Sequence, residues 1–251
     1  MPVTTERHDR ILLIRLEREE KRNAIDREMA DGIDEALNSL EDDADLWVGV
    51  LTGTAAVFSA GTDMRQSRSP ATERGGEYGV IRRDRHKPLI AAVEGFALGG
   101  GFEIVLACDL VVASSTARFG LPEVQRGLVP TCGGMFRSGR SLPLNVAREL
   151  LLTGDPLDAD RAERLGLVNR VVEPGGAVQE ALALAARICR NAPLAVRESL
   201  AALEAESAAH DASSWASTDA AADRILGSPD AKEGTKAFFE RRAPTWSGAT
   251  S

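Results

Sequence analysis

Residues 89–123, LIAAVEGFALGGGFEIVLACDLVVASSTARFGLPE, decide the fold of this chain. The apolar run at 89–93 is typical of a buried strand, and the glycines at 99–101 lead into an apolar helix predicted over residues 100–108. A second apolar strand is predicted over residues 109–113. A strand, a helix and a strand in this order favour the α/β class.

The glycine triplet also indicates an anion site. Three glycines at the start of a helix leave main-chain amides that no side chain covers and that have no partner within the helix. The helix dipole favours negative charge at that end. Glu103 follows in the first turn, and Glu123 follows the second strand. Two carboxyl groups and an anion cradle could therefore share a small volume.

The same alternation continues on both sides of this stretch. Strands are predicted over residues 11–16, 47–53 and 167–172, and Asp26 is the expected N-cap of a helix with Met29, Ile33, Ala36, Leu37 and Leu40 on one face. Gly154 and Gly166 are expected to end helices. Helices without intervening strands are predicted over residues 178–190, 193–209, 213–226 and 229–241. We expect a sheet-bearing body at 1–190, and a helical region at 191–251 that docks on the body or on a neighbouring subunit.

Composition limits the classes of function. The chain has 251 residues, 43% of them hydrophobic, and a formal net charge of -8, which argues against a general nucleic-acid binder. A basic cluster at residues 82–87 is expected to be a solvated helix face, with a phosphate site as the less favoured alternative. The three cysteines show no disulfide or zinc pattern. We expect a cytoplasmic protein that neither enters a membrane nor binds a metal.

Familiar catalytic patterns are missing from the sequence. There is no Gly-x-Ser-x-Gly elbow, no phosphate-binding P-loop and no His-Glu-x-x-His pair. The amides of Thr62 and Gly100 each lie beside a glycine after a strand and could converge on one oxygen as an oxyanion hole. With an acid and a base beside it, such a hole suits proton transfer next to a thioester carbonyl. The alternative is structural, because Glu103 and Glu123 could complement helix dipoles and the glycines could serve close packing.

Six motifs together resemble the crotonase superfamily, the enoyl-CoA hydratases and isomerases. They are KRNA at 21–24, FSAGTDM at 58–64, VEGFALGGGFE at 93–103, RFGLPE at 118–123, LVPTCGG at 128–134 and AKEGTKAFFERR at 231–242. The resemblance implies an α/β fold built as a spiral of ββα units, with a C-terminal helical trimerisation region. It also implies a homotrimer or a hexamer made of two trimers.

The resemblance assigns roles to residues. Thr62 and Gly100 match the oxyanion hole for the thioester oxygen of an acyl-CoA, Glu103 matches the glutamate that activates water, and Glu123 matches the one that exchanges a proton at the α carbon. Coenzyme A enters as part of the substrate, and no separate cofactor is implied. The implied substrate and coenzyme A contacts are Lys21, Arg22, Ala24, Ala60, Gly61, Asp63, Met64, Gly99, Pro122, Thr131, Phe238 and Arg241.

Both glutamates together favour a 2-enoyl-CoA hydratase that forms a 3-hydroxyacyl-CoA in fatty acid or related acyl-CoA degradation. An isomerase or another crotonase-type lyase, which needs only Glu123, and a non-catalytic acyl-CoA binder are the alternatives. The chain departs from the family pattern at Thr62, where alanine is commoner, and at Leu121, which replaces a polar residue of some members. Thr131 stands where many hydratases have glycine, and we expect its bulk to shift the catalytic water or narrow the acyl pocket.

Overall fold

The computed structural model describes residues 2–66, 68–208 and 210–248, and its main feature is a six-stranded sheet. The sheet order is β1 (Val3–His8), β2 (Ile11–Leu16), β3 (Val48–Thr52), β7 (Leu89–Val93), β9 (Leu110–Ser114) and β12 (Arg170–Val172). β1 pairs antiparallel with β2, and the other neighbours are parallel. Every residue of β3 and β7 is buried, as the predicted apolar runs require.

A smaller sheet lies beside the first. Its order is β11 (Leu157–Asp158), β10 (Arg118–Gly120), β8 (Phe96–Leu98) and β4 (Val57–Ser59), and β4, β8 and β10 are parallel. The pairs β3 and β4, β7 and β8, and β9 and β10 each place one strand in the large sheet and the next in the small one. The spiral of ββα units implied by the resemblance is therefore confirmed.

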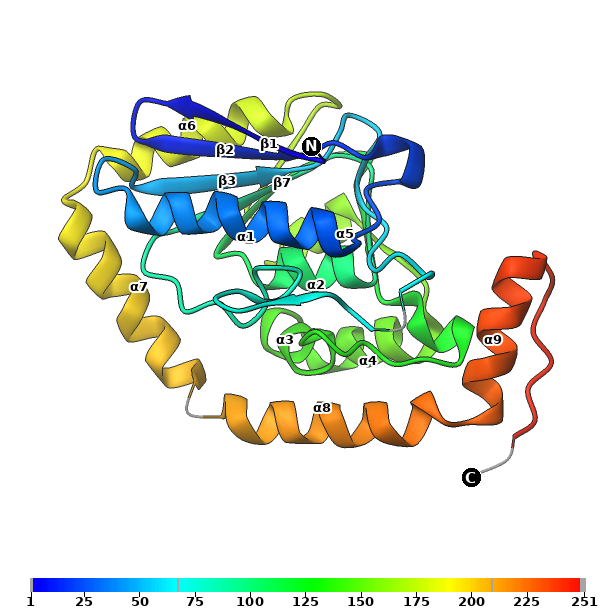
Figure 1. Cartoon of the computed structure of the whole chain (residues 1–251). Coiled ribbons are helices and arrows are strands. Elements are labelled where there is room, and N and C mark those ends of the chain that lie inside the picture. The colour runs from blue at the N-terminus through cyan, green and yellow to red at the C-terminus, as the bar shows by residue number, and fades with distance from the viewer. Residues whose placement is uncertain (1, 67, 209, 249–251) are drawn as a thin grey trace.

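The described residues form helices on both faces of the large sheet and outside it. They are α1 (Arg27–Asp42), α2 (Gly100–Leu106), α3 (Gly134–Ser141), α4 (Leu144–Thr153), α5 (Ala159–Arg164), α6 (Ala177–Cys189), α7 (Pro193–Ala208), α8 (Asp211–Leu226) and α9 (Pro229–Glu240). Alternate side chains of the strands pack against α6 on one face and against a larger core with α1 on the other. Figure 1 shows the sheet between these two helices. None of the helices in the described ranges is long and apolar enough to cross a membrane.

The last three helices extend from the body as an arc (Figure 1). α7 buries no residue and α8 buries only Thr218 among the residues that the structure describes. α9 instead packs against η2 (Pro122–Arg126), a 3-10 helix. The two lie so close that a β-carbon at position 234, which is glycine, would overlap the Arg126 carbonyl. Residue 209, where we predicted that a helix ends, lies outside the described residues.

Local signals explain most element boundaries. Asp26 caps α1 as predicted, because its carboxylate accepts a hydrogen bond from the Met29 amide at 3.1 Å. Gly154 caps α4 in the left-handed region, and Gly166 follows the end of α5 with a φ of 84°. Strand β1 escaped prediction because four of its six residues are exposed, so it lacks an apolar run.

Candidate active site

Three parallel strands of the small sheet end side by side and deliver the candidate residues. β4 leads to Thr62, β8 leads to Gly99 and Gly100, and β10 leads to Glu123. Glu103 lies one turn into α2, which begins directly after β8. Ligands of α/β proteins commonly bind beyond the carboxyl ends of such strands. The sheet therefore brings four predicted residues, from three separate stretches of sequence, to one edge.

The main-chain amides of Thr62 and Gly100 lie close together and are free. A β-carbon on Gly61, whose φ is 88°, would lie 2.7 Å from the Gly100 nitrogen. Within the described ranges, neither the Thr62 amide nor the Gly100 amide donates a hydrogen bond to the protein. Two unpaired donors next to each other, at the start of a helix, are suited to an oxygen that gains negative charge.

Glu103 is buried, with 2% of its surface exposed, yet its carboxylate is well supported. Its Oε1 atom accepts hydrogen bonds from the amides of Cys132 at 2.7 Å and Gly134 at 2.8 Å. Burial raises the pKa of Glu103 to about 7, while these two amides and the nearby Arg137 pull it down. Gly134 leaves room for this carboxylate, since a β-carbon at 134 would lie only 3.0 Å from Oε1.

Glu123 has the opposite surroundings. Its Oε2 atom is buried without a hydrogen-bond partner among the described residues. Burial and, to a lesser extent, the charge of Glu103 together raise the pKa of Glu123 to about 8. A β-carbon on Gly99 would lie 3.1 Å from Oε1 of Glu123, so the carboxyl group lies directly over the residue that precedes Gly100. The two carboxyl groups are therefore close enough to interact, and both lie near the free amides.

Two of the segments predicted to contact coenzyme A lie side by side. The Arg22 carbonyl accepts a hydrogen bond from the Ala60 amide at 3.0 Å, and the Ile25 amide donates to the Gly61 carbonyl at 2.8 Å. Buried Asn23 ties them further, through hydrogen bonds to the carbonyls of Val57 and Phe58, both at 3.0 Å. These contacts leave Lys21 and Arg22 exposed at the surface.

The remaining predicted contacts differ in their surroundings. Asp63 is 8% exposed and pairs with Arg18 at 3.3 Å and Arg65 at 3.1 Å, and the Arg65 side chain lowers the pKa of Asp63. Phe238 is 44% exposed and lies with its ring centre 5.1 Å from the Arg126 guanidinium carbon. Other members of the predicted set are found at the surface (Arg241, Ala60), partly buried (Ala24, Met64, Thr131) or buried (Gly99, Pro122).

Sequence reasoning missed Tyr78, the only tyrosine of the chain. It is 1% exposed, and its hydroxyl group lies 2.6 Å from Thr62 Oγ1 and 3.0 Å from Ser69 Oγ. A β-carbon on Gly100 would overlap that hydroxyl group. Tyr78 thus contacts both residues of the predicted oxyanion hole. Its sequence neighbours offered only a weak signal, the glycines at 75, 76 and 79.

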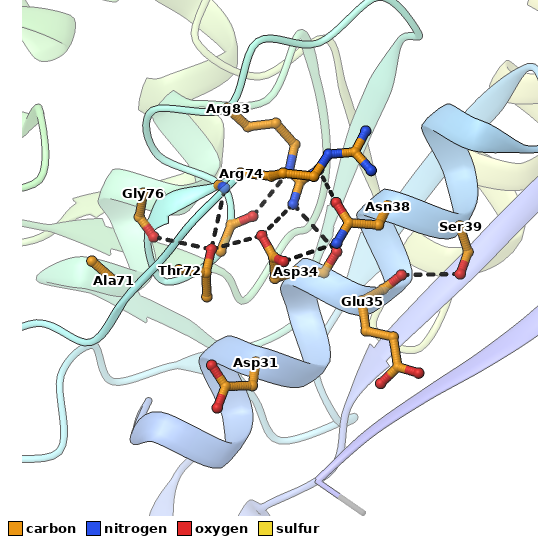
Figure 2. A network of polar contacts seen from close by, with 12 residues as sticks. Asp31, Asp34, Glu35, Asn38, Ser39, Ala71, Thr72, Arg74, Gly76 and Arg83 are labelled. Atoms are coloured by element: carbon orange, nitrogen blue, oxygen red, sulfur yellow. Dashed lines mark hydrogen bonds and ion pairs between the residues drawn. The ribbon is translucent and has the colours of Figure 1, made fainter.

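The segment that carries Tyr78 is fixed to α1 by a buried network (Figure 2). The Arg83 side chain, 2% exposed, pairs with Asp34 and donates to Asn38 Oδ1 at 2.7 Å and to the Gly79 carbonyl at 3.1 Å. Thr72 donates to Asp34 Oδ1 at 2.6 Å from the other end of the segment. The network therefore anchors the segment to α1.

The interpretation of residues 82–87 as a solvated helix face is wrong. No helix forms there, and Arg83 and Lys87 are buried. Arg85 donates to the Asp109 carboxylate at 2.7 and 2.8 Å, and Lys87 Nζ donates to the Leu40 and Asp43 carbonyls, both at 2.7 Å. Since these cationic groups already have protein partners, the less favoured phosphate site has no support either.

Comparison with known proteins places this geometry in a family. A family model described as enoyl-CoA hydratase/isomerase matches residues 6–249. The mevalonyl-coenzyme A hydratase of Aspergillus fumigatus is 40% identical over 94% of this chain and 91% of its own length. The short-chain-enoyl-CoA hydratase of Clostridium acetobutylicum is 35% identical over 96% of this chain and 95% of its own length.

A solved structure agrees with the sequence comparisons. The carnitinyl-CoA hydratase of Mycobacterium avium superposes with a TM-score of 0.94 at 40% identity and covers 99% of both chains. The match extends through the spiral and the C-terminal helices alike. The chain belongs to the enoyl-CoA hydratase/isomerase family of the crotonase superfamily.

Proposed function

We propose that this protein is a 2-enoyl-CoA hydratase. Glu103 takes a proton from water, and the water oxygen bonds to the β carbon of the enoyl thioester. The electron pair of the double bond moves towards the thioester oxygen, which the amides of Thr62 and Gly100 hold as it gains negative charge. Glu123 then gives its proton to the α carbon, and the product is a 3-hydroxyacyl-CoA. In this proposal coenzyme A arrives with the substrate, and no resident cofactor takes part.

The observation that carries the proposal is that the neighbouring carboxyl groups of Glu103 and Glu123 have different hydrogen-bond surroundings. Two amides donate to Oε1 of Glu103, which favours its ionised form, whereas Oε2 of Glu123 is buried without a partner, which favours its protonated form. Water addition needs one ionised base and one protonated acid at the same time. Pairs of carboxyl groups whose environments differ in this way commonly divide acid and base roles.

The relatives support the same chemistry. Two proteins at 40% and 35% identity are named as hydratases of coenzyme A thioesters, and both cover nearly the full chain. The proposed coenzyme A contacts are the residues that the family resemblance assigns, including Lys21, Arg22 and the segment 60–64. Phe238 and Arg241 are proposed to contact the coenzyme A of a neighbouring subunit.

Incubation of the purified protein with crotonyl-CoA tests the proposal. Loss of the enoyl thioester absorbance with formation of 3-hydroxybutyryl-CoA is the expected result. Conversion of a 3-enoyl-CoA to a 2-enoyl-CoA without hydration would replace the proposal by an isomerase. Tight binding of acyl-CoA without turnover on a panel of thioesters would replace it by a non-catalytic binder.

A trimer, or a dimer of trimers, is part of the proposal. The C-terminal helices and the segment after them expose large apolar side chains, namely Leu194, Leu203, Leu226, Phe238, Phe239 and Trp246. Exposed apolar side chains that gather on one region indicate a protein interface. Light scattering coupled to size-exclusion chromatography would give the mass of the assembly, and a monomer mass would contradict this part.

A further inference from the structure

We propose that the acyl pocket selects an acyl group with an uncharged hydrogen-bonding substituent, such as a hydroxyl group, and that Tyr78 is the residue that determines this specificity. This inference rests on the proposed function, since it names the substrate class of the same site. It also predicts that an alkyl chain of the same size is a poorer substrate.

The location of Tyr78 is the first argument. Its hydroxyl group contacts the Thr62 side chain at 2.6 Å and lies against Cα of Gly100, the two residues whose amides are free. Tyr78 also neighbours Cys132, whose amide donates to Glu103 and whose Sγ donates to Ser69 Oγ at 3.4 Å. Tyr78 therefore lies between the place proposed for the thioester oxygen and the proposed base. In this proposal the acyl carbons of a bound substrate lie beside that region.

The order of the hydroxyl groups is the second argument. Cys132 Sγ donates to Ser69, and contacts of 3.0 Å and 2.6 Å continue the chain to Tyr78 and then to Thr62. The contact that would close the ring, from Thr62 to Ser69, is the longest oxygen pair at 3.3 Å. A hydroxyl proton at the end of such a chain can turn to a ligand with little loss. Thr62 and Ser69 are also partly exposed, whereas Tyr78 is buried.

Charge is the third argument, and it favours an uncharged substituent. Hydroxyl groups are neutral donors and acceptors. Burial and the nearby Glu103 raise the pKa of Tyr78, so its phenol keeps its proton. A carboxylate on the acyl group would be repelled by the ionised Glu103 in a buried region, and the nearby Arg137 would offset only part of that repulsion.

The anchoring of Tyr78 is the fourth argument. Its φ of 57° is unusual for a residue with a side chain, and such a conformation persists only where the surroundings enforce it. Gly79 follows Tyr78, and its carbonyl accepts a hydrogen bond from the Arg83 side chain. Gly79 also lies against α1, because a β-carbon on it would be 2.6 Å from the Ala30 carbonyl. Figure 2 shows the network that joins Arg83 to α1. A side chain that is fixed in this way is suited to recognition.

Size-matched substrates test the inference. The pairs are 4-hydroxycrotonyl-CoA with trans-2-pentenoyl-CoA, and 5-hydroxy-2-pentenoyl-CoA with trans-2-hexenoyl-CoA, in which a methyl group replaces the hydroxyl group. We expect the ratio of kcat/KM within at least one pair to favour the hydroxyl compound by about tenfold or more. In Tyr78→Phe this ratio should fall by about tenfold. Comparison of ratios cancels the intrinsic reactivity of the substrates.

Controls separate recognition from folding. Thr62→Val keeps the amide and removes the hydroxyl group, so it should lower the same ratio even if Tyr78→Phe fails to fold. Ser217→Ala removes a hydroxyl group that donates only to Ser213 of its own helix, and its ratio should equal that of the wild type. Fumaryl-CoA, which carries a carboxylate, should be a poorer substrate than 4-hydroxycrotonyl-CoA.

The outcomes are distinguishable from failure of the proposed function. If the wild-type protein hydrates no enoyl-CoA, the proposed function is wrong. If it hydrates both members of each pair equally well, or if the ratio is unchanged in Tyr78→Phe and Thr62→Val, the hydratase assignment stands and this inference is overturned. Faster turnover of fumaryl-CoA would overturn the requirement for an uncharged group.

Discussion

The Cys132 amide donates a hydrogen bond of 2.7 Å to Oε1 of Glu103, although the two residues are 29 positions apart in the sequence. The loop before α3 therefore orients the carboxylate that we propose as the base. Glu103→Gln would remove the ionised form while keeping the size of the side chain. We expect hydration of crotonyl-CoA to fall by about a hundredfold or more, as measured by the initial rate.

Glu94→Gln is the matched control for this substitution. Glu94 is also a buried glutamate, 5% exposed, and its Oε1 accepts hydrogen bonds from the amides of Gly175 and Ala177 at 3.0 and 3.1 Å. It lies outside the proposed site, so its replacement should change the rate by less than about threefold. Equal rates for the wild type and Glu103→Gln would contradict the assignment of the base.

The pH dependence of hydration should be bell-shaped. The proposed reaction needs Glu103 ionised and Glu123 protonated, and burial raises the pKa values of these groups to about 7 and about 8. The kcat/KM for crotonyl-CoA should rise through the lower value and fall through the higher one, with both values belonging to the pair. A profile that stays flat between pH 6 and pH 9 would be inconsistent with this division of roles.

Stability should depend on the protonation of Glu123. A carboxyl group whose pKa is higher in the folded state binds more protons when folded, so the free energy of unfolding falls as pH rises from about 4.5 to about 8. Glu123→Gln removes this loss. The difference between its free energy of unfolding and that of the wild type should be about 4 kcal/mol more positive at pH 9 than at pH 5, as measured by urea denaturation.

Glu149→Gln provides the comparison for that measurement. Glu149 pairs with Arg161 at 2.6 Å on the surface, and the Arg161 side chain lowers its pKa. The Glu149 carboxyl group is therefore ionised at pH 9 in both the folded and the unfolded chain, and it is mostly ionised in both at pH 5. The relative stability of this variant should not change between the two values, and a change as large as that of Glu123→Gln would refute the explanation.

The network around Arg83 should contribute much more stability than a surface ion pair. Arg83→Met leaves Asp34 without its buried partner, and we expect the free energy of unfolding to fall by about 3 kcal/mol. Arg74→Met breaks the pair with Asp42, whose side chains are 47% and 64% exposed, and should cost less than about 1 kcal/mol. Similar losses in both variants would show that the burial of Arg83 is not decisive.

Gly61 should tolerate no side chain. Its φ of 88° disfavours any other residue, and a β-carbon would lie 2.9 Å from the Leu98 carbonyl as well as near the Gly100 amide. Gly61→Ala should therefore lower the hydration rate by about a hundredfold, because a displacement of about 1 Å at the reacting centre has effects of that size. Gly227→Ala, where a β-carbon would meet no atom within 4 Å, should behave as the wild type.

The regular elements could be predicted where local signals are strong. The strand over 11–16 and the helix after Asp26 agree with β2 and α1, because an apolar run and a capping aspartate are properties of neighbouring residues. The positions of Glu103, Glu123, Thr62 and Gly100 at one sheet edge also followed from strand ends and from the family resemblance. Their chemical roles stay predictions, as do the division at residue 190 and the cytoplasmic location.

The wrong or missing predictions around the candidate site have one physical cause, which is contact between residues far apart in the sequence. The sequence predicts that Arg83 and Arg85 are surface charges. In the structure Arg83 pairs with Asp34, which is 49 positions away, and Arg85 pairs with Asp109, which is 24 positions away. The sequence around Tyr78 predicts an ordinary loop residue, and only the structure shows its contacts with Thr62 and Gly100. No local pattern of residues encodes either arrangement.

The contact between α9 and η2 links the end of the chain to turnover. A protease that cuts before Pro229 would remove the helix that supports the short turn carrying Glu123, while the large sheet, α1 and α6 would keep their own core. The circular dichroism spectrum of such a clipped chain should lose only the contribution of α9, while its hydration rate should fall sharply. Proteolytic removal of the residues from Pro229 onward would then abolish hydration irreversibly.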